Sequence, residues 1–265
     1  MRSWFSEDLP LVRYSVWCLL LLLGHVFLSH LDRVVHDLMQ AVEPQVFLFF
    51  RAVTEIGDSK WTLVPTGVLG LLLFLTGRYG FSGHRLAALS TWLASAFFFV
   101  FVSIALSGIV VNVIKIVVGR GRPKLLDQTG LTGFDPFTLS GTFHSFPSGH
   151  TNTAFALAIA VSMMIPRWRG GLLAIATAVG VSRIVVGAHF LTDVIGGAAL
   201  AVPTTWWLRQ RFAAHGLVFT KGRMGEYALR WPGRLIPVAA SRFFRKEFPR
   251  LLPADERPSQ WVGPA

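Results

Sequence analysis

Three short segments of the sequence carry side chains that could act together on a phosphate group. They are residues 115–123 (KIVVGRGRP), residues 147–150 (PSGH) and residues 182–193 (SRIVVGAHFLTD). A phosphomonoester carries up to two negative charges, and phosphoryl transfer depends mainly on positioning and on stabilising that charge. Cationic side chains grouped with histidines suit this chemistry, so the three segments predict a phosphate site.

Five residues of these segments are predicted to bind the phosphate directly. Lys115 offers a point charge, whereas Arg122 and Arg183 each offer a planar fork that can hold two phosphate oxygens. Ser148 and Gly149 follow a proline and open a predicted helix, so their backbone N–H groups and the helix dipole favour an anion. Together these groups predict a site that uses no metal ion and no other cofactor.

Two histidines are predicted to break the phosphate ester bond. His189 and Asp193 are four residues apart, which places both on one face of a helix. The Asp193 carboxylate then holds one ring nitrogen and leaves the other nucleophilic. His150 protonates the leaving alkoxide and afterwards activates the water that hydrolyses the phosphohistidine. Ser182 is a weaker candidate for phosphate binding, because its hydroxyl could instead pack between helices.

Simpler interpretations exist for the same cations. An isolated Lys or Arg at the end of a membrane span often extends its charge to the interface, which could explain Lys115, Arg122 and Arg183 taken singly. Arg120 and Lys124 could steer an anionic substrate or could equally be solvated loop charges. The two histidines and the aspartate at fixed spacing favour the phosphate site.

The elements that position these segments are predicted to lie in a membrane. Of the 265 residues 52% are hydrophobic and only 15% are charged, whereas a soluble domain usually carries about a quarter charged residues. Long apolar runs predict spans, and the mixed stretch 30–57 predicts interfacial helices between spans one and two. The expected fold is an all-α polytopic membrane protein with a six-span domain, residues 1–208, and a basic tail, residues 209–265. The spans are predicted at residues 14–29, 61–76, 86–114, 148–165, 171–188 and 190–208.

Positive charges predict the orientation of this bundle. The short arginine-bearing loops and the tail fall on one side of the six-span arrangement, which the positive-inside rule assigns to the cytoplasm. The three segments then face the periplasm or exterior of a cytoplasmic membrane. The tail holds eleven Lys/Arg against four Asp/Glu, a large part of the net charge of +11, so this charge predicts membrane retention and not a nucleic-acid partner. Cys18 is the only cysteine, which excludes an internal disulfide.

The three segments closely resemble the type 2 phosphatidic acid phosphatase family, whose pattern is KxxxxxxRP, then PSGH, then SRxxxxxHxxxD. The resemblance extends over roughly residues 54–205. It implies a six-helix core, a nucleophilic His189, a general acid/base His150 and an orienting Asp193. It also implies phosphate binding by Lys115, Arg122, Ser148, Gly149 and Arg183. The matched positions are Lys115, Arg122, Pro123, Pro147, Ser148, Gly149, His150, Ser182, Arg183, His189 and Asp193.

Hydrolysis of a membrane lipid phosphate or diphosphate is the leading functional expectation, with the bilayer holding the lipid tail. The resemblance implies candidate substrates: undecaprenyl diphosphate, phosphatidylglycerol phosphate, phosphatidic acid, diacylglycerol diphosphate and lipid A. A lipid phosphotransferase would use the same phosphohistidine, and an anion transporter would use the same cations without the His189/Asp193 spacing. Vanadate-dependent haloperoxidase chemistry fits the same pocket in soluble relatives, but the predicted spans argue against it.

Overall fold

The computed structural model describes residues 28, 30–80, 83–130, 132–222 and 225–230, and these are mainly helical. A helix at residues 30–40 precedes the labelled elements. The helices are α2 (Pro44–Thr54), α3 (Lys60–Leu75), α4 (His84–Val118), α5 (Pro123–Thr129), α6 (Gly149–Met164), α7 (Arg169–Val185) and α8 (Leu191–Ala214). Short helical turns lie at Glu55–Gly57, Thr76–Gly80, Gly141–Phe143 and Pro166–Trp168, and two short strands, β1 (Phe219–Lys221) and β2 (Tyr227–Leu229), end the described chain.

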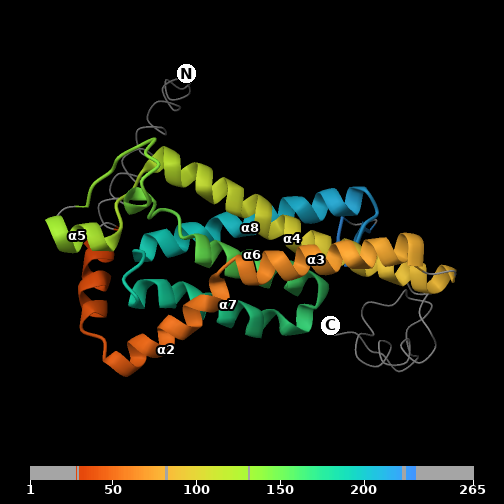
Figure 1. Cartoon of the computed structure of the whole chain (residues 1–265), viewed down its shortest axis with the longest axis horizontal. Helices are drawn as coiled ribbons and strands as arrows, with labels where there is room; N and C mark the ends of the chain where they lie inside the picture. Colours follow the sequence, from red (N-terminus) through yellow and green to blue (C-terminus); the bar gives the residue numbers. More distant parts are fainter. Residues whose placement is uncertain (1–27, 29, 81–82, 131, 223–224, 231–265) are drawn as a thin grey trace, which may run out of the picture.

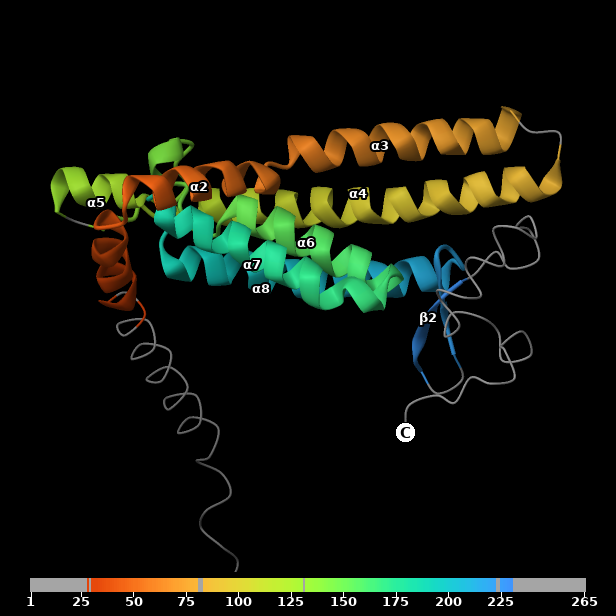
Figure 2. The same cartoon turned by 90° about the horizontal axis from the view of Figure 1, so that it is seen from below.

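Helices α4, α6, α7 and α8 form the central bundle. α6 packs against α4, α7 and α8, while α3 runs along α4 on the outside of the bundle (Figure 2). Four alanines of α6 are buried, at positions 154, 156, 158 and 160. Small side chains let helix backbones approach closely, which is the usual way that helices associate in a bilayer. The composition of α6 therefore explains its central position.

Three segments of the described chain are long and apolar enough to cross a membrane: Pro44–Gly80, Leu86–Val118 and Pro166–Val185. They include the predicted second and third spans and all but the last three residues of the predicted fifth span. Helices also form at the predicted fourth and sixth spans, as α6 and α8. The predicted first span, residues 14–29, lies almost entirely outside the described residues. A mostly helical membrane protein is thus confirmed, whereas the count of six spans stays a prediction.

Several boundaries differ from those expected. The predicted interfacial stretch 30–57 forms two helices, and the second, α2, is apolar enough to be grouped with α3 in one candidate span. α7 ends at Val185, three residues before the predicted end of its span, because the chain turns at Gly187, whose φ is +66°. α8 continues to Ala214, six residues beyond the predicted end at 208.

The two strands are a departure from the predicted all-α fold. β1 and β2 pair antiparallel, with Phe219 opposite Leu229. The ring of Phe219 is buried and meets the ring of Phe99 on α4 at a centroid distance of 4.9 Å. The hairpin therefore closes the end of the apolar core between α4 and α8, and the beginning of the predicted basic tail packs onto the bundle. The rest of that tail, residues 231–265, lies outside the described residues.

Candidate active site

The three phosphate segments lie at one end of the bundle. They occupy the end of α4 with the loop that follows it, the beginning of α6, and the turn between α7 and α8, at the left in Figure 1. The helix at residues 30–40 and α5 lie at the same end. The turn between α6 and α7, with Arg167 and Arg169, lies at the opposite end. The directions of the helices therefore bring the three segments together at one end, as the sequence predicts.

Gly119 turns the chain sharply at the end of α4. Its φ is +56°, a conformation that glycine adopts without strain, and a Cβ at this position would overlap the backbone of Asp135. The loop 119–147 then folds back on itself: the Gly121 N–H donates to the Gly133 carbonyl at 2.8 Å and the Arg122 N–H donates to the Thr142 carbonyl at 2.9 Å. Backbone hydrogen bonds therefore fix this long polar loop over the end of the bundle.

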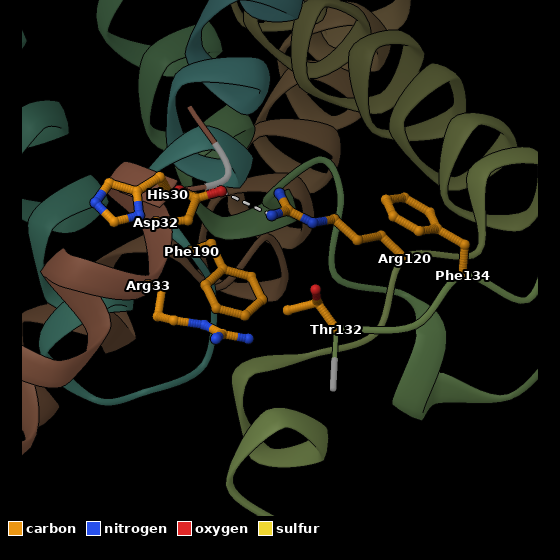
Figure 3. Close-up of a pocket in the computed structure, with 7 residues that line it drawn as sticks. All are labelled: His30, Asp32, Arg33, Arg120, Thr132, Phe134 and Phe190. Atoms are coloured by element: carbon orange, nitrogen blue, oxygen red, sulfur yellow. Dashed lines mark hydrogen bonds and ion pairs between the residues drawn. The ribbon is translucent and has the colours of Figure 1, made fainter. Parts of the chain in front are cut away.

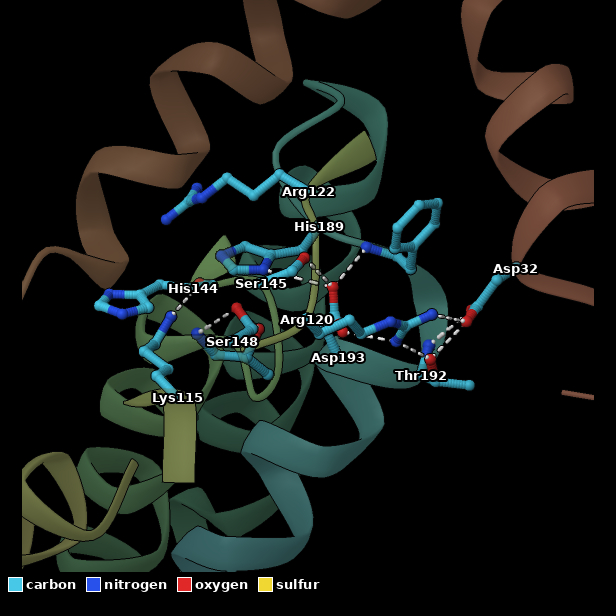
Figure 4. A network of polar contacts seen from close by, with 12 residues as sticks. Asp32, Lys115, Arg120, Arg122, His144, Ser145, Ser148, His189, Thr192 and Asp193 are labelled. Atoms are coloured by element: carbon cyan, nitrogen blue, oxygen red, sulfur yellow. Dashed lines mark hydrogen bonds and ion pairs between the residues drawn. The ribbon is translucent and has the colours of Figure 1, made fainter. Parts of the chain in front are cut away.

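The same loop holds two of the predicted phosphate ligands in place. The Lys115 Nζ donates to the carbonyl of His144 at 2.7 Å, and the Arg122 Nε donates to the carbonyl of Gly141 at 2.9 Å. Lys115 is buried. Burial lowers the pKa of Arg122, an effect that the charge of Asp193 opposes. These contacts orient the two cations toward the region of His189, as Figure 4 shows.

Ser148 caps α6, but its backbone N–H does not point freely into the site. That N–H donates to the carbonyl of Asp193 at 2.9 Å, and the Ser148 Oγ accepts from the Thr151 hydroxyl at 2.9 Å. The Ser148 N–H thus connects the beginning of α6 to α8, and phosphate binding by Ser148 stays a prediction. Ser148 still has its own hydroxyl proton to donate, and Gly149 supplies the first backbone N–H of α6.

His189 and Asp193 form a buried pair at the beginning of α8. The His189 Nδ1 lies 3.5 Å from the Asp193 Oδ2, and both side chains are almost completely buried. That oxygen also accepts from the Ser145 hydroxyl at 2.5 Å and from the Phe190 N–H at 2.9 Å. Burial lowers the pKa of His189 to about 4, although the Asp193 carboxylate acts in the opposite direction. The imidazole is therefore neutral near pH 7, as a nucleophile requires.

Arg183 and Ser182 lie on the last turns of α7 and behave differently. The Arg183 Nη1 donates to the hydroxyl of Thr54 on α2 at 2.5 Å, while its buried Nε has no hydrogen-bond partner among the described residues. A phosphate oxygen would satisfy that nitrogen. The Ser182 hydroxyl is buried and donates to the carbonyl of Val179 at 2.6 Å. In the structure this hydroxyl therefore makes a contact within α7, and phosphate binding by Ser182 stays a prediction.

His150 completes the predicted set from the first turn of α6. The turn Glu55–Gly57 passes close over it, because a Cβ at Gly57 would lie 3.0 Å from the His150 Cβ. His150 lies within electrostatic reach of Lys115, Arg122 and Arg183. The three cations also act on one another. Such repulsion favours binding of an anion among them.

Arg120 was not among the expected site residues. The sequence suggests a steering group or a solvated loop charge, yet the side chain is only 11% exposed and lies between two carboxylates, Asp32 and Asp193. Two further side chains, Thr192 and Ser145, join this network (Figure 4). One signal pointed to Arg120: a cation two residues before Arg122, on the face where the positive-inside rule expects few. Nothing near Asp32 in the sequence pointed to the site.

Comparisons with known proteins show which family and which proteins this chain resembles. The family model of the PAP2 superfamily matches residues 96–216. The lipid A 1-phosphatase of Rhizobium johnstonii is 33% identical, over 73% of this chain and 74% of that protein, and the lipid A 1-phosphatase of Rhizobium etli is 32% identical, over 70% and 78%. A similar fold occurs in the PAP2 type phosphatidylglycerolphosphate phosphatase of Bacillus subtilis. That structure has a TM-score of 0.51 and 20% identity, covering 75% of this chain and 94% of that one.

Proposed function

This chain belongs to the PAP2 superfamily, and we propose that it is a membrane phosphatase that hydrolyses a lipid phosphate through a phosphohistidine at His189. The observation that carries the proposal is the buried pair of His189 and Asp193, which lies within electrostatic reach of Lys115 and Arg122, while Arg183 acts on His150. When the imidazole is neutral and its Nδ1 faces the Asp193 carboxylate, its Nε2 is free to attack phosphorus. Lys115, Arg122 and Arg183 balance the charge that develops on the phosphate oxygens.

His150 acts as the proton carrier in both halves of the proposed reaction. In the first half it gives a proton to the oxygen of the leaving lipid alcohol, while the bond from phosphorus to His189 forms. In the second half it takes a proton from water, which attacks the phosphohistidine and releases inorganic phosphate. Asp193 stabilises the positive imidazole that exists between the two steps. The two halves together return His150 to its starting, protonated state.

Lipid A is the first substrate to test. Two relatives that are more than 30% identical over most of their length carry the name lipid A 1-phosphatase. Phosphatidylglycerol phosphate, phosphatidic acid, diacylglycerol diphosphate and undecaprenyl diphosphate are the alternatives. All five present a phosphate on an apolar anchor, which suits a cationic site at the end of a helical bundle.

We further propose that six spans in residues 1–208 carry this site at the outer face of a cytoplasmic membrane, with residues 209–265 as the cytoplasmic tail. The three motif segments share one end of the bundle, and the arginine-bearing turn Pro166–Trp168 lies at the other. The positive-inside rule then favours the motif end for the outer side. A lipid of the outer leaflet could present its phosphate there without leaving the bilayer.

Phosphate release by the purified, detergent-solubilised protein tests the activity. We expect inorganic phosphate from at least one of the five lipids, and we expect His189→Ala to release none above background. A phosphate-labelled protein should appear in a rapid quench of wild type and be missing from His189→Ala. A wild type that is inactive on all five lipids would contradict the proposal. Release only after a second lipid alcohol is added would favour the phosphotransferase.

A further inference from the structure

The carboxylate that orients His189 is itself held by an ion pair. The Arg120 Nη1 donates to the Asp193 Oδ1 at 2.6 Å, on the oxygen that does not face His189. The Arg120 Nη2 donates to the Asp32 Oδ2 at 2.7 Å. The guanidinium thus bridges two buried carboxylates, as Figure 4 shows, and Figure 3 shows its contact with Asp32. The two carboxylates lie in distant parts of the sequence.

Asp32 is also tied to α8 without the help of Arg120. Its Oδ1 accepts from the Thr192 N–H at 2.9 Å, and its Oδ2 accepts from the Thr192 hydroxyl. The same hydroxyl accepts from the Arg120 Nη1 at 2.6 Å. The Phe190 ring covers the guanidinium, with Cζ 4.7 Å from the ring centroid. The helix at residues 30–40, the loop after α4 and the beginning of α8 therefore meet in one closed polar network.

We propose that Asp32 is a positioning residue for the reaction and acts through Arg120 on Asp193, which in turn sets the charge and orientation of His189. This inference rests on the proposed function, because it assigns a role within that site. These four side chains form a row in which the charges alternate. The charge is negative at Asp32, positive at Arg120, negative at Asp193 and, during turnover, positive at His189. In buried surroundings each charge strongly affects the next one.

The alternation predicts that removing the charge of Arg120 and removing the charge of Asp32 shift the pKa of His189 in opposite directions. Without the Arg120 charge, Asp193 stabilises the imidazolium more strongly, so the pKa of His189 rises. Without the Asp32 charge, the whole charge of Arg120 acts on Asp193, so the pKa of His189 falls. Lys115 of α4 and Arg122 of the loop also face His189 and lower its pKa. Both are unchanged in these variants and do not alter the sign of either shift.

Histidine titration tests this directly, by nuclear magnetic resonance of the full-length protein with labelled imidazoles. His189→Gln identifies the His189 signal. We expect Arg120→Gln to move the His189 titration to higher pH and Asp32→Asn to move it to lower pH. Asp127→Asn is the matched control, because Asp127 on α5 pairs at 2.8 Å with His36, which lies on the same helix as Asp32, and does not contact Asp193. This control should leave the His189 titration unchanged.

Kinetics on the same variants test whether Asp32 acts through Arg120. With lipid A in mixed micelles, we expect Arg120→Gln and Asp32→Asn each to lower kcat on the order of tenfold to a hundredfold, with little change in KM. In the double variant kcat should be no lower than in Arg120→Gln alone, because without Arg120 the charge of Asp32 no longer acts on Asp193. Arg120→Lys keeps the charge and should recover part of kcat. Thermal unfolding in detergent identifies any variant that does not fold, and Arg120→Met, which also removes the charge, then replaces Arg120→Gln.

The outcomes separate this inference from the proposed function. His189 shifts of the same sign in the two variants, or independent multiplicative losses of kcat in the double variant, would overturn the role of Asp32 in an active enzyme. A wild type that releases no phosphate from any of the five lipids would overturn the proposed function. In that case opposite His189 shifts would still establish the charge row, and matching shifts would overturn it as well.

Discussion

At the scale of single residues, the site depends on keeping an imidazole neutral among cations and beside a carboxylate. Burial is the largest influence on His189 and disfavours its charged form, whereas Asp193 favours that form. Burial wins, and the ring is neutral at neutral pH. The same environment leaves the Nε of Arg183 buried without a partner among the described residues. Both features fit the proposed binding of a phosphate, whose oxygens could accept from the Arg183 Nε.

The titration of His189 in the protein without substrate is a first prediction. Because burial lowers the pKa of His189 to about 4, the ring should stay neutral as the pH falls to 5 and gain its proton only near pH 4. Nuclear magnetic resonance of labelled histidine measures this, with His189→Gln for assignment. Activity that requires the neutral ring should persist to the same pH, after allowance for ionisation of the lipid phosphate, whose second pKa is about 6. A titration near the ordinary value of 6.5 would contradict the buried environment.

The geometry of Arg122 supports a second prediction. Its Nε is held by the Gly141 carbonyl, so the rest of the fork can face the phosphate in a fixed orientation. Arg122→Lys keeps one positive charge but loses the planar fork. We expect it to lose about 1.5–3 kcal/mol of transition-state stabilisation, so that kcat/KM falls roughly tenfold to a hundredfold. Arg211→Lys, at the far end of α8, is the control and should change kcat/KM little. Equal effects of the two substitutions would argue against a specific phosphate contact.

At the scale of elements, the helices were more predictable than the contacts between them. Apolar runs located α3, α4, α6, α7 and α8 within a few residues, because burial and lipid exposure both require continuous apolar sequence. The ends were less accurate: α8 runs six residues past its predicted end, where amphipathic residues such as Arg209 cover the hairpin. The hairpin itself has only three residues in each strand. Its position depends on packing against Phe99 and not on a local pattern.

The contact between α6 and α8 gives a third prediction. A Cβ at Gly197 on α8 would overlap the carbonyl oxygen of Ser148 and lie 3.3 Å from the Asn152 nitrogen. Gly197→Ala should therefore push α6 and α8 apart, cost about 1–3 kcal/mol of stability, and reduce activity by displacing the Ser148–Asp193 tie. Unfolding temperature and phosphate release in detergent measure both effects.

Gly171 on α7 is the matched control for that substitution. A Cβ there meets nothing within 4 Å, and alanine favours a helix more than glycine does. Gly171→Ala should thus leave the unfolding temperature equal or higher. If Gly197→Ala were as stable and active as Gly171→Ala, the close approach of the two helices would not be needed for the site.

At the scale of the whole molecule, the sequence predicted that the three motif segments meet. It could not predict which residues far away in the sequence, such as Asp32, pair with them. Alternating helix directions bring Lys115, His150 and His189 to one end of the bundle, which follows from the order of spans alone. Asp32 is 88 residues from Arg120. In the sequence it was only a polar interruption of an apolar stretch, and no local periodicity marks a pair that forms by tertiary packing.

The orientation of the molecule in the membrane gives the last prediction. Leu139, in the loop over the site, is 80% exposed, and Trp168, in the turn at the opposite end, is 59% exposed. In a Cys18→Ser background, Leu139→Cys should react with a membrane-impermeant maleimide in intact spheroplasts, whereas Trp168→Cys should react only after permeabilisation. The reason is electrostatic: Arg167 and Arg169 flank Trp168 and favour the cytoplasmic side, whereas the cations of the loop that holds Leu139 are proposed to bind phosphate. Labelling in the reverse pattern would place the site on the cytoplasmic face, where only inner-leaflet lipids could reach it.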